Sequence, residues 1–330
     1  MVWYIASFLK MEFVKDIIGE ELKTFELKFS EAVKTKTTLL DSIMKYIIKR
    51  KGKQLRPMFV FLSAKLHGEI NESTYRAAAL VELLHTATLV HDDVVDESYE
   101  RRGFFSINAV WKNKIAVLVG DYLLSKGLLL STTNEDFRHL HIISDAVRQM
   151  SEGELLQMEK SRKLNLDEAV YFEIITNKTA SLLSSACAVG AYSTTGDDDI
   201  TGKMKDFGEK VGIAFQIKDD LFDYGSADIG KPTGNDIKEK KITLPLIYTL
   251  NRVDKATRKQ LIYILKNKNK EKKQVDLVLQ AVLDNGGIAY AEEKMQAYRD
   301  EALGILNAFP ATPERRALEE LVRYTTDRKY

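Results

Sequence analysis

The sequence predicts an all-α protein, and two observations carry that prediction. Apolar residues recur at helical spacing along most of the chain, most clearly in the uninterrupted run from Asn71 to Glu100. The 330 residues include only 18 Gly and 5 Pro, where average usage would give roughly 40 in total. So few turn-forming residues disfavour a sandwich or barrel built from many short strands. No segment alternates apolar and polar residues for long enough to predict a strand.

The N-terminal stretch from Val2 to Leu9 is interpreted as the start of an amphipathic helix, since it is too short to span a membrane. In a second interpretation, Met11 is the natural start and residues 1–10 are translational excess. Further helices are expected at 18–50, 71–100, 111–131, 138–160, 167–192, 203–225, 243–265, 275–285, 288–308 and 315–325.

Short turns separate these helices. Asp197, Asp198 and Asp199 follow Gly196 and are interpreted as a loop without a functional role. The charge-rich stretch from Lys266 to Lys273 is interpreted as a solvated turn between two helices. Because no linker rich in Pro or Ser divides the chain, residues 1–330 are expected to form one large helical bundle domain.

Composition excludes several classes of protein. With 45% hydrophobic and 29% charged residues, the chain is globular and not disordered. The 49 basic and 48 acidic residues give a net charge of +1, so no overall field favours nucleic acid. Cys187 is alone, which excludes a disulfide framework and a cysteine-built zinc site. A cytoplasmic protein is expected.

Two acidic motifs are the strongest chemical feature. In LVHDDVVDE (89–97), Asp92 and Asp96 share one helical face, which continues back to Thr88 and His85. FQIKDDLFDY (215–224) repeats the pattern, with Asp219, Asp223 and the adjoining Gln216. Carboxylates combined with substrate phosphates are the usual ligands of Mg²⁺. A solvated helix end explains one such motif, but two motifs favour a metal-binding function.

Basic residues lie close to these motifs in the sequence. Lys53 and Arg56 are three apart at a predicted helix start, which favours anion binding. Arg101 and Arg102 follow the first acidic motif and can bind diphosphate or neutralise the acids. Each pair alone is typical of an exposed face. Together with the acidic motifs, they predict a cavity for metal ions and at least two phosphate-bearing groups.

The ordered motifs identify a resemblance. The chain resembles the trans-isoprenyl diphosphate synthase (polyprenyl synthetase) family, and most of all its bacterial medium- and long-chain polyprenyl diphosphate synthases. The resemblance extends from about Asp41 to the C-terminus, through GKQLRP, LLHTATLVHDDVVDESYERRG, GELLQ, NKTASLL, FQIKDDLFDY, GKPTGNDIKEKKITLPL and DRKY. It implies the isoprenoid synthase fold, a helical bundle around a central substrate cavity. It also implies a homodimer and a Mg²⁺-dependent head-to-tail condensation of isopentenyl diphosphate with geranyl, farnesyl or geranylgeranyl diphosphate.

Residue roles follow from the resemblance, position by position. Three Mg²⁺ ions are implied, with Asp92 and Asp96 facing Asp219 and Asp223, and Asp220 close by. The implied isopentenyl diphosphate site is formed by Lys53, Arg56, His85 and Arg102. The implied allylic diphosphate site is formed by Arg101, Lys178, Thr179, Gln216, Lys231 and Lys241, of which Arg101 and Lys178 are also catalytic. The sequence departs from many relatives at Lys51 and Gln54, while Lys53 and Arg56 are retained.

The implied reaction needs no protein base. Loss of the allylic diphosphate leaves a cation, the π-bond of isopentenyl diphosphate attacks it, and the departing pyrophosphate can remove the final proton. His85 is therefore interpreted as a phosphate-binding or buried structural residue. Water must be excluded from the cation.

Product length is expected to depend on Ala87 and Thr88, which stand five and four residues before Asp92, the first Asp of the first motif, and are both small. The tail should pass them and stop near 122–130, giving about C30 to C40, with at most peripheral membrane contact for product release. The alternatives are a geranylgeranyl or farnesyl diphosphate synthase, a non-catalytic subunit of a heteromeric synthase, a terpene cyclase and an HD-type phosphohydrolase. The last would need metal-ligating histidines that His67, His85, His139 and His141 do not provide in register.

Overall fold

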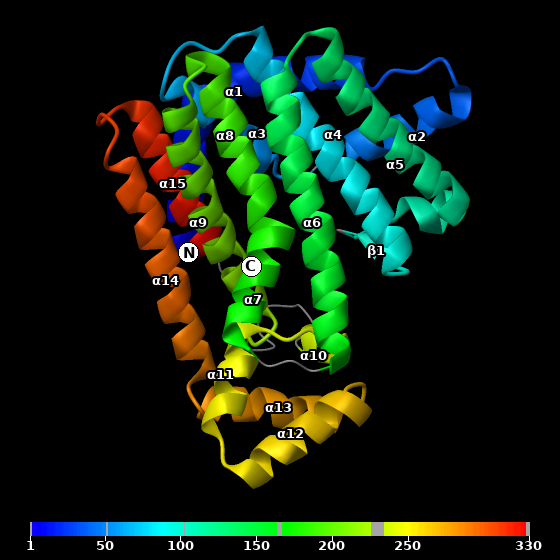
Figure 1. The fold of residues 1–330 in the computed structure, drawn as a ribbon, viewed down its shortest axis with the longest axis vertical. Helices are drawn as coiled ribbons and strands as arrows, with labels where there is room; N and C mark the ends of the chain where they lie inside the picture. The colour runs from blue at the N-terminus through cyan, green and yellow to red at the C-terminus, as the bar shows by residue number, and fades with distance from the viewer. Residues whose placement is uncertain (1, 51, 102, 164–166, 226–233, 328–330) are drawn as a thin grey trace.

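The computed structural model describes residues 2–50, 52–101, 103–163, 167–225 and 234–327. Helices make up most of these residues, which confirms the predicted all-α class (Figure 1). The longer helices are α1 (Val2–Ala32), α4 (Glu72–Val95), α5 (Ile107–Thr133), α6 (Phe137–Lys163), α8 (Ser181–Thr195), α9 (Asp198–Phe222), α14 (Gly287–Leu306) and α15 (Pro313–Asp327). The shorter helices are α2 (Thr38–Lys49), α3 (Leu55–Lys65), α7 (Glu168–Ile175), α10 (Asn235–Lys238), α11 (Leu244–Arg252), α12 (Lys255–Asn267) and α13 (Lys272–Asp284).

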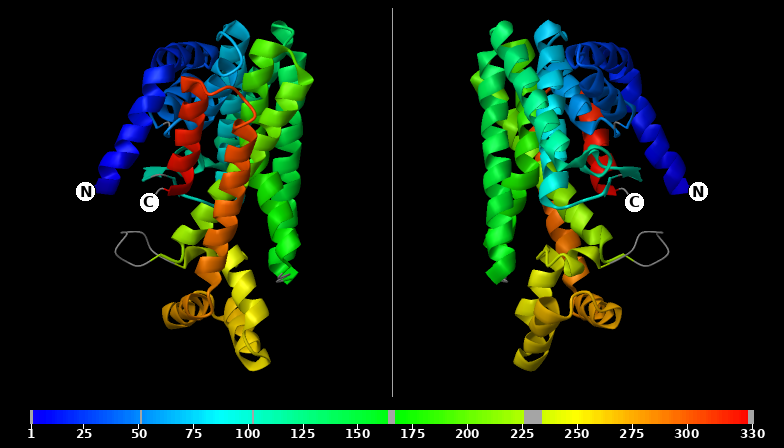
Figure 2. Two further views of the ribbon diagram at one scale, coloured as in Figure 1. Left: turned by 90° about the vertical axis from the view of Figure 1, so that its left-hand side faces the viewer. Right: turned by 90° about the vertical axis from the view of Figure 1, so that its right-hand side faces the viewer.

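The bundle is organised around α8. This helix packs against α3, α4, α6 and α9, while α14 packs on the other side of α9 and α5 packs on α4 (Figures 1 and 2). Its sequence explains its central position, since its buried face is made of small side chains such as Ser184, Ala188 and Ala191. Small residues allow neighbouring helices to approach closely on every side.

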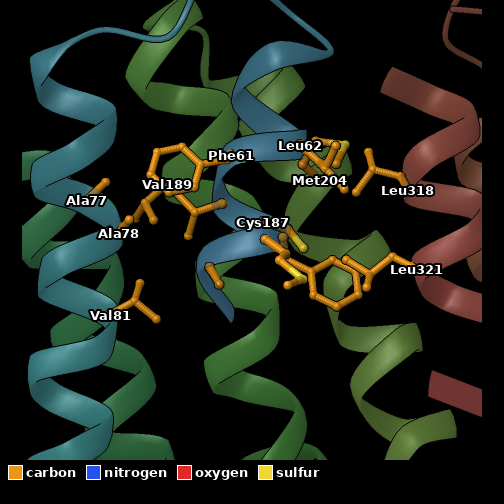
Figure 3. Close-up of a cluster of buried hydrophobic side chains, with 14 of the residues drawn as sticks. Phe61, Leu62, Ala77, Ala78, Val81, Cys187, Val189, Met204, Leu318 and Leu321 are labelled. Carbon is orange, nitrogen blue, oxygen red and sulfur yellow. The ribbon is translucent and has the colours of Figure 1, made fainter. Parts of the chain in front are cut away.

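The main core lies where α3, α4, α8, α9 and α15 meet (Figure 3). Phe61 and Leu62 of α3 are fully buried there, as are Met204 of α9 and Leu318 of α15. Cys187 lies in the same cluster, and burial raises the pKa of its thiol to about 12. The thiol is therefore a protonated core group, in agreement with the absence of any predicted cysteine chemistry.

Several predicted helix ends are wrong. The expected helix 18–50 is divided into α1 and α2, which are separated by residues 33–37. The expected helix 243–265 is divided at Asp254. The Asp254 carboxylate accepts hydrogen bonds from the N–H groups of Ala256 and Thr257 and so starts α12. The expected loop at Asp197–Asp199 is also wrong. Asp197 is the N-cap of α9 and accepts from the N–H groups of Asp199 and Ile200. At Asp254 a capping side chain starts a new helix without a neighbouring Gly or Pro, whereas at Asp197 the cap follows Gly196, whose φ of 62° ends α8.

The helix that carries the first acidic motif is shorter than predicted. It ends at Val95 rather than Glu100, and a small antiparallel hairpin follows, formed by β1 (Glu100–Arg101) and β2 (Phe104–Phe105). Gly103 supplies the positive φ of 76° that this tight turn requires. Within the described part of the chain these are the only strands, and sequence periodicity missed them because each has two residues.

The helices α12 and α13 lie beyond the lower end of the long helices, attached to α11 (Figures 1 and 2). Their buried faces form a separate cluster with Leu246 and Leu250 of α11. The turn predicted at Lys266–Lys273 is confirmed, since α12 ends at Asn267 and α13 begins at Lys272.

Candidate active site

An acidic cavity of about 460 Å³ lies at the end of the bundle near α7, α10 and α11. Four residues of the predicted allylic diphosphate site line it together, namely Lys178, Thr179, Gln216 and Lys241. Four carboxylates line it as well, from Asp219 and Asp220 of the second acidic motif, from Asp236 of α10 and from Asp167, the N-cap of α7. The fold therefore brings cationic, amide and carboxylate side chains from separate segments of the chain into one cavity.

A π-helical turn places two of these residues. Residues Thr176–Ala180 (η1) form the turn between α7 and α8, and Lys178 and Thr179 lie within it. Such turns are rare and recur at functional sites. The ammonium of Lys178 pairs with the Glu154 carboxylate and donates a hydrogen bond to Gln157 Oε1 at 3.3 Å. Both partners belong to the GELLQ motif of α6, so this motif orients Lys178.

Two glycines allow helices to approach the π-helical turn. A Cβ on Gly153 of α6 would lie 2.8 Å from the backbone nitrogen of Lys178. A Cβ on Gly212 of α9 would lie 2.5 Å from Cα of Ala180. Any larger side chain at either position would push the flanking helix away from the cavity wall.

A chain of hydrogen bonds crosses the cavity wall. Thr179 Oγ1 donates to Gln216 Oε1, and Gln216 Nε2 donates to Asp220 Oδ1, each at 2.8 Å. The hydroxyl of Tyr171 donates to the other oxygen of Asp220, also at 2.8 Å. Burial and the charge of Asp236 raise the pKa of Asp220 to about 7, while these two hydrogen bonds oppose the rise. Asp220 is thus held in place by donors on both of its oxygens.

Asp236 is a site residue for which the sequence analysis proposed no role. Burial, followed by the charge of Asp223, raises its pKa to about 6. Lys241 Nζ lies 3.9 Å from Asp236 and 2.6 Å from Glu239. The available clue was its position in GNDIKEKK, but a single acid within a charged run gives no periodic pattern.

Asp223 has an additional contact that the motif does not reveal. It is the C-cap of α9, and its carboxylate accepts hydrogen bonds from the N–H groups of Asn235 at 2.8 Å and Asp236 at 3.0 Å. Asp223 therefore fixes the start of α10 and with it the position of Asp236. Lys231 belongs to the intervening segment and lies outside the described residues.

The first acidic motif is placed at the end of α4. Asp92 is half-buried and Asp96 is the exposed C-cap, its N–H donating to the Asp92 carbonyl. The described residues that line the acidic cavity do not include these two. Lys241 connects the acidic cavity with the first motif. Burial lowers the pKa of its ammonium, but the nearby carboxylates of Glu239, Asp236 and Asp96 raise it by more, so the pKa of Lys241 is raised overall. Lys241 lines the acidic cavity together with Asp219 and Asp220, and it also interacts with the charge of Asp96 in the first motif.

A second cavity, of about 500 Å³, is lined by Arg50, Lys53 and Arg56, after which it is called the basic cavity, by the carboxylates of Glu26, Glu82 and Asp93, and by many apolar side chains. Lys53, Arg56 and His85, all assigned to the isopentenyl diphosphate site by resemblance, line it together. The apolar wall includes Phe25, Phe29, Ile48, Leu89, Ile107 and Phe215. Arg102 lies outside the described residues, and of Arg101 only the backbone in β1 is described.

Arg50 and Asp93 are among the charged residues of this basic cavity that the sequence analysis missed. The guanidinium of Arg50 lies 3.1 Å from the ring centroid of Tyr46 and 4.7 Å from that of Phe104, a cation–π arrangement that fixes its position. Asp93, the middle acid of the first motif, is buried and lines this cavity, not the acidic one. The sequence analysis assigned Asp92 and Asp96 to one helical face and gave Asp93 no role.

The donor set fits a hard divalent cation that is bound together with phosphate. Within the described ranges, no three His, Cys, Asp or Glu side chains are gathered closely enough to hold a metal by themselves. The carboxylates of Asp219, Asp220 and Asp236 nevertheless line one cavity beside Lys178 and Lys241. Such a site suits Mg²⁺, which commonly takes one or two carboxylates and completes its shell with substrate phosphates and water.

The residues predicted to control product length lie on α4. Ala87 is fully buried in a cluster that contains Val119 and Leu123 of α5. Thr88 is half-buried, and its hydroxyl donates to the His85 carbonyl at 2.9 Å. Among the residues described, these two line neither cavity, whereas their neighbours Thr86 and Leu89 line the basic one.

Sequence comparison finds a family match over most of the chain. The polyprenyl synthetase family model matches residues 37–282. Among curated relatives, the all-trans-nonaprenyl-diphosphate synthase (geranyl-diphosphate specific) of Rhodobacter capsulatus is 33% identical, covering 97% of this chain and 99% of its own.

Solved structures agree in fold along nearly the whole length. A polyprenyl synthase from Caulobacter crescentus, complexed with calcium and isoprenyl diphosphate, has a TM-score of 0.89 at 32% identity, covering 97% of this chain and 98% of its own. A geranylgeranyl pyrophosphate synthase from Bacteroides thetaiotaomicron has a TM-score of 0.83 at 35% identity, covering 97% and 99%.

Proposed function

The chain belongs to the polyprenyl synthetase family, and from this premise we propose that it condenses isopentenyl diphosphate with allylic diphosphates to make a trans-polyprenyl diphosphate. The observation that carries the proposal is the division of the phosphate-binding residues between two cavities. Lys178, Thr179, Gln216 and Lys241 line one, and Lys53, Arg56 and His85 line the other. A condensation of two diphosphates needs two such sites held in register.

In the acidic cavity, this chain's residues support departure of the allylic diphosphate. Lys178 and Lys241 place positive charge where pyrophosphate gains negative charge, which lowers the barrier to breaking the allylic C–O bond. In the basic cavity, Lys53 and Arg56 hold the isopentenyl diphosphate so that its π-bond can attack the allylic carbon. The departing pyrophosphate takes the final proton, and His85 serves binding rather than proton transfer.

We assign Mg²⁺ to Asp219 and Asp223 of the second motif and to Asp92 and Asp96 of the first, with Asp220 supporting them. When bound, the metal supplies positive charge that stabilises the leaving pyrophosphate. The support is the carboxylate-lined cavity and the calcium in the Caulobacter crescentus complex. Three ions remain the expected number.

The primary test supplies purified protein with labelled isopentenyl diphosphate, farnesyl diphosphate and Mg²⁺. Label is expected in polyprenyl products only when both diphosphates are present, and a chelator should stop its incorporation. Cyclic hydrocarbons formed from the allylic substrate alone would instead indicate a terpene cyclase. Activity that appears only after a second protein is added would indicate a subunit of a heteromeric synthase.

The proposed product is about C30 to C40, with geranylgeranyl diphosphate as the runner-up. Ala87 and Thr88 are both small, which supports this length through the family resemblance. Chromatography of the wild-type products should give chains beyond C20, and Thr88→Phe should shorten them. Products that stop at C15 or C20 in the wild type would contradict the assignment. Ala87→Tyr is the weaker test, because a fully buried alanine leaves no space for the ring.

A homodimer in the cytoplasm is the proposed state of the enzyme. Within the described residues, α5 alone is long and apolar enough to cross a membrane by length and composition, and only 33% of its apolar window is buried. Val117, Leu118, Leu128 and Leu129 are exposed on it. A second copy of the chain covering this face accounts for its apolar character, as large exposed apolar patches commonly mark interfaces.

A further inference from the structure

The α12–α13 hairpin differs in charge from the rest of the chain. Residues 252–284 contain nine Lys and Arg against four Asp and Glu, whereas the whole chain contains 49 against 48. The basic residues are Arg252, Lys255, Arg258, Lys259, Lys266, Lys268, Lys270, Lys272 and Lys273. The excess is therefore local to one element of the fold.

The charges on α12 form a stripe. Lys255, Lys259, Tyr263 and Lys266 are exposed at spacings of four, four and three residues, and exposed Lys270 continues the stripe into the turn. The opposite face carries Leu261, Ile264 and Leu265, which are buried in the cluster shared with α11 and α13. One face of α12 thus packs against α11 and α13. The other face is exposed and carries lysines around Tyr263, which is 54% exposed.

The stripe is not neutralised by acids on the same face. Lys268 pairs with Glu271, but no ion pair joins Lys255, Lys259, Lys266 or Lys270 to an acid within the portion of the chain that the structure describes. Lys240 extends the basic surface, since its ammonium donates to the Lys266 carbonyl at 3.0 Å. On α13, Leu277 and Leu283 are also exposed among the polar residues.

The hairpin lies at the end of the molecule that holds the acidic cavity. It is attached to α11 (Figures 1 and 2), and Ile247 of α11 lines that cavity. A surface that binds α12 would therefore lie near the end of the bundle where the reaction is proposed to occur.

We propose that the α12 face of Lys255, Lys259, Tyr263, Lys266 and Lys270 docks the protein on an anionic lipid surface. Clustered lysines are attracted to anionic headgroups, and an exposed tyrosine among them is suited to the boundary between headgroups and acyl chains. The choice of a lipid over another polyanion rests on the proposed function, because a polyprenyl product carries a long apolar tail that a bilayer accepts.

The test is co-sedimentation of the full-length protein with vesicles. Vesicles with about one third phosphatidylglycerol should bind it, and pure phosphatidylcholine vesicles should not. Binding should decrease from 50 to 500 mM salt, because salt screens exposed charges. The triple variant Lys259→Gln, Lys266→Gln, Lys270→Gln should bind anionic vesicles on the order of 100-fold more weakly, about 5-fold for each lysine.

A matched control removes three exposed lysines elsewhere, with Lys23→Gln, Lys36→Gln and Lys203→Gln, and should keep wild-type binding. The variant Tyr263→Trp adds a reporter whose emission should shift to the blue with anionic vesicles. The proposal would be overturned if both triple variants weakened vesicle binding equally, or if the wild type bound neutral and anionic vesicles equally. It would also be overturned if the protein bound RNA but no vesicles.

Enzyme activity in the absence of vesicles is measured separately, and the α12 triple variant should retain it with a short soluble primer. Vesicle binding by a wild-type protein that makes no polyprenyl product would overturn the proposed function and support the docking surface alone.

Discussion

Asp219 and Asp198 lie on the same helix, yet only Asp219 lines the acidic cavity. We expect Asp219→Ala to lower kcat by several orders of magnitude without unfolding the protein, because it removes a hard ligand beside the leaving group. Asp92→Ala should do the same. Steady-state kinetics at saturating Mg²⁺, with circular dichroism to verify folding, measure the effect.

Asp198→Ala is the matched control for this prediction. Asp198 forms an exposed pair with Arg138 at 2.5 Å in the first turn of α9. Its loss should cost less than about 1 kcal/mol of stability and leave kcat unchanged. Near-normal turnover in the Asp219 or Asp92 variant would contradict the assignment of these helices to catalysis.

Tyr171 is expected to position Asp220 rather than touch substrate. In Tyr171→Phe the buried Asp220 carboxylate loses one hydrogen-bond donor. The loss of a hydrogen bond to a buried group costs about 1–3 kcal/mol of free energy. We expect roughly a 10-fold or greater loss in kcat/KM for the allylic substrate, with the KM for isopentenyl diphosphate unchanged. Tyr290→Phe removes a similar 2.8 Å hydrogen bond, to Glu168 outside the cavity lining. Equal kinetic losses in both variants would show that Tyr171 has only a structural role.

At the residue scale, the sequence predicted side chains that belong to recognisable motifs. It missed side chains whose role depends on a contact formed only in the folded structure. Lys178 and Thr179 were assigned through the family resemblance and Gln216 also through its place beside the second acidic motif, and the three line one cavity. Tyr171 was missed because an aromatic residue at helical spacing is ordinarily a core residue, and its hydrogen bond to Asp220 exists only after α7 packs against α9.

At the element scale, the approach of α9 to η1 determines the shape of the acidic cavity. Gly212→Ala should lower stability by about 1–3 kcal/mol, because the added methyl would lie 2.5 Å from Ala180 Cα. Displacement of η1 should also raise the allylic KM. Thermal unfolding and substrate kinetics measure the two effects.

Gly202→Ala tests the same substitution on the same helix without the contact. No atom lies within 4 Å of a Cβ at Gly202, so the change should stabilise α9 by up to about 1 kcal/mol. If Gly212→Ala were equally stabilising, the close approach of α9 to η1 would not be a constraint on the fold.

Element boundaries were the least predictable part of the fold. The apolar pattern identified most long helices, but it merged α11 with α12 because their apolar faces continue in phase across Asp254. It also ran through 167–192 without revealing η1, since a π-turn inserts one residue without changing the apolar composition. The first boundary is fixed by the Asp254 side chain that caps α12 and the second by the backbone hydrogen bonds of η1, and the apolar pattern encodes neither.

At the scale of the whole molecule, the exposed apolar face of α5 should form the contact between two copies. Leu118 is 63% exposed, and Leu118→Glu should convert a dimer to a monomer in light scattering coupled to size exclusion. Leu27→Glu, on α1 at 72% exposure, should leave the dimer intact. A monomeric wild type, or no change in the Leu118 variant, would contradict the assignment of this face.

The assignment of one substrate to each cavity is tested most directly by measuring KM for both substrates in variants of each cavity. Lys53→Ala and Arg56→Ala should raise the KM for isopentenyl diphosphate by about 10- to 150-fold, the loss of a charge-assisted hydrogen bond, and should change the allylic KM little. Lys178→Ala should show the opposite selectivity. A rise in the allylic KM in the Arg56 variant would show that the two sites are exchanged, and equal rises for both substrates in every variant would contradict the division itself.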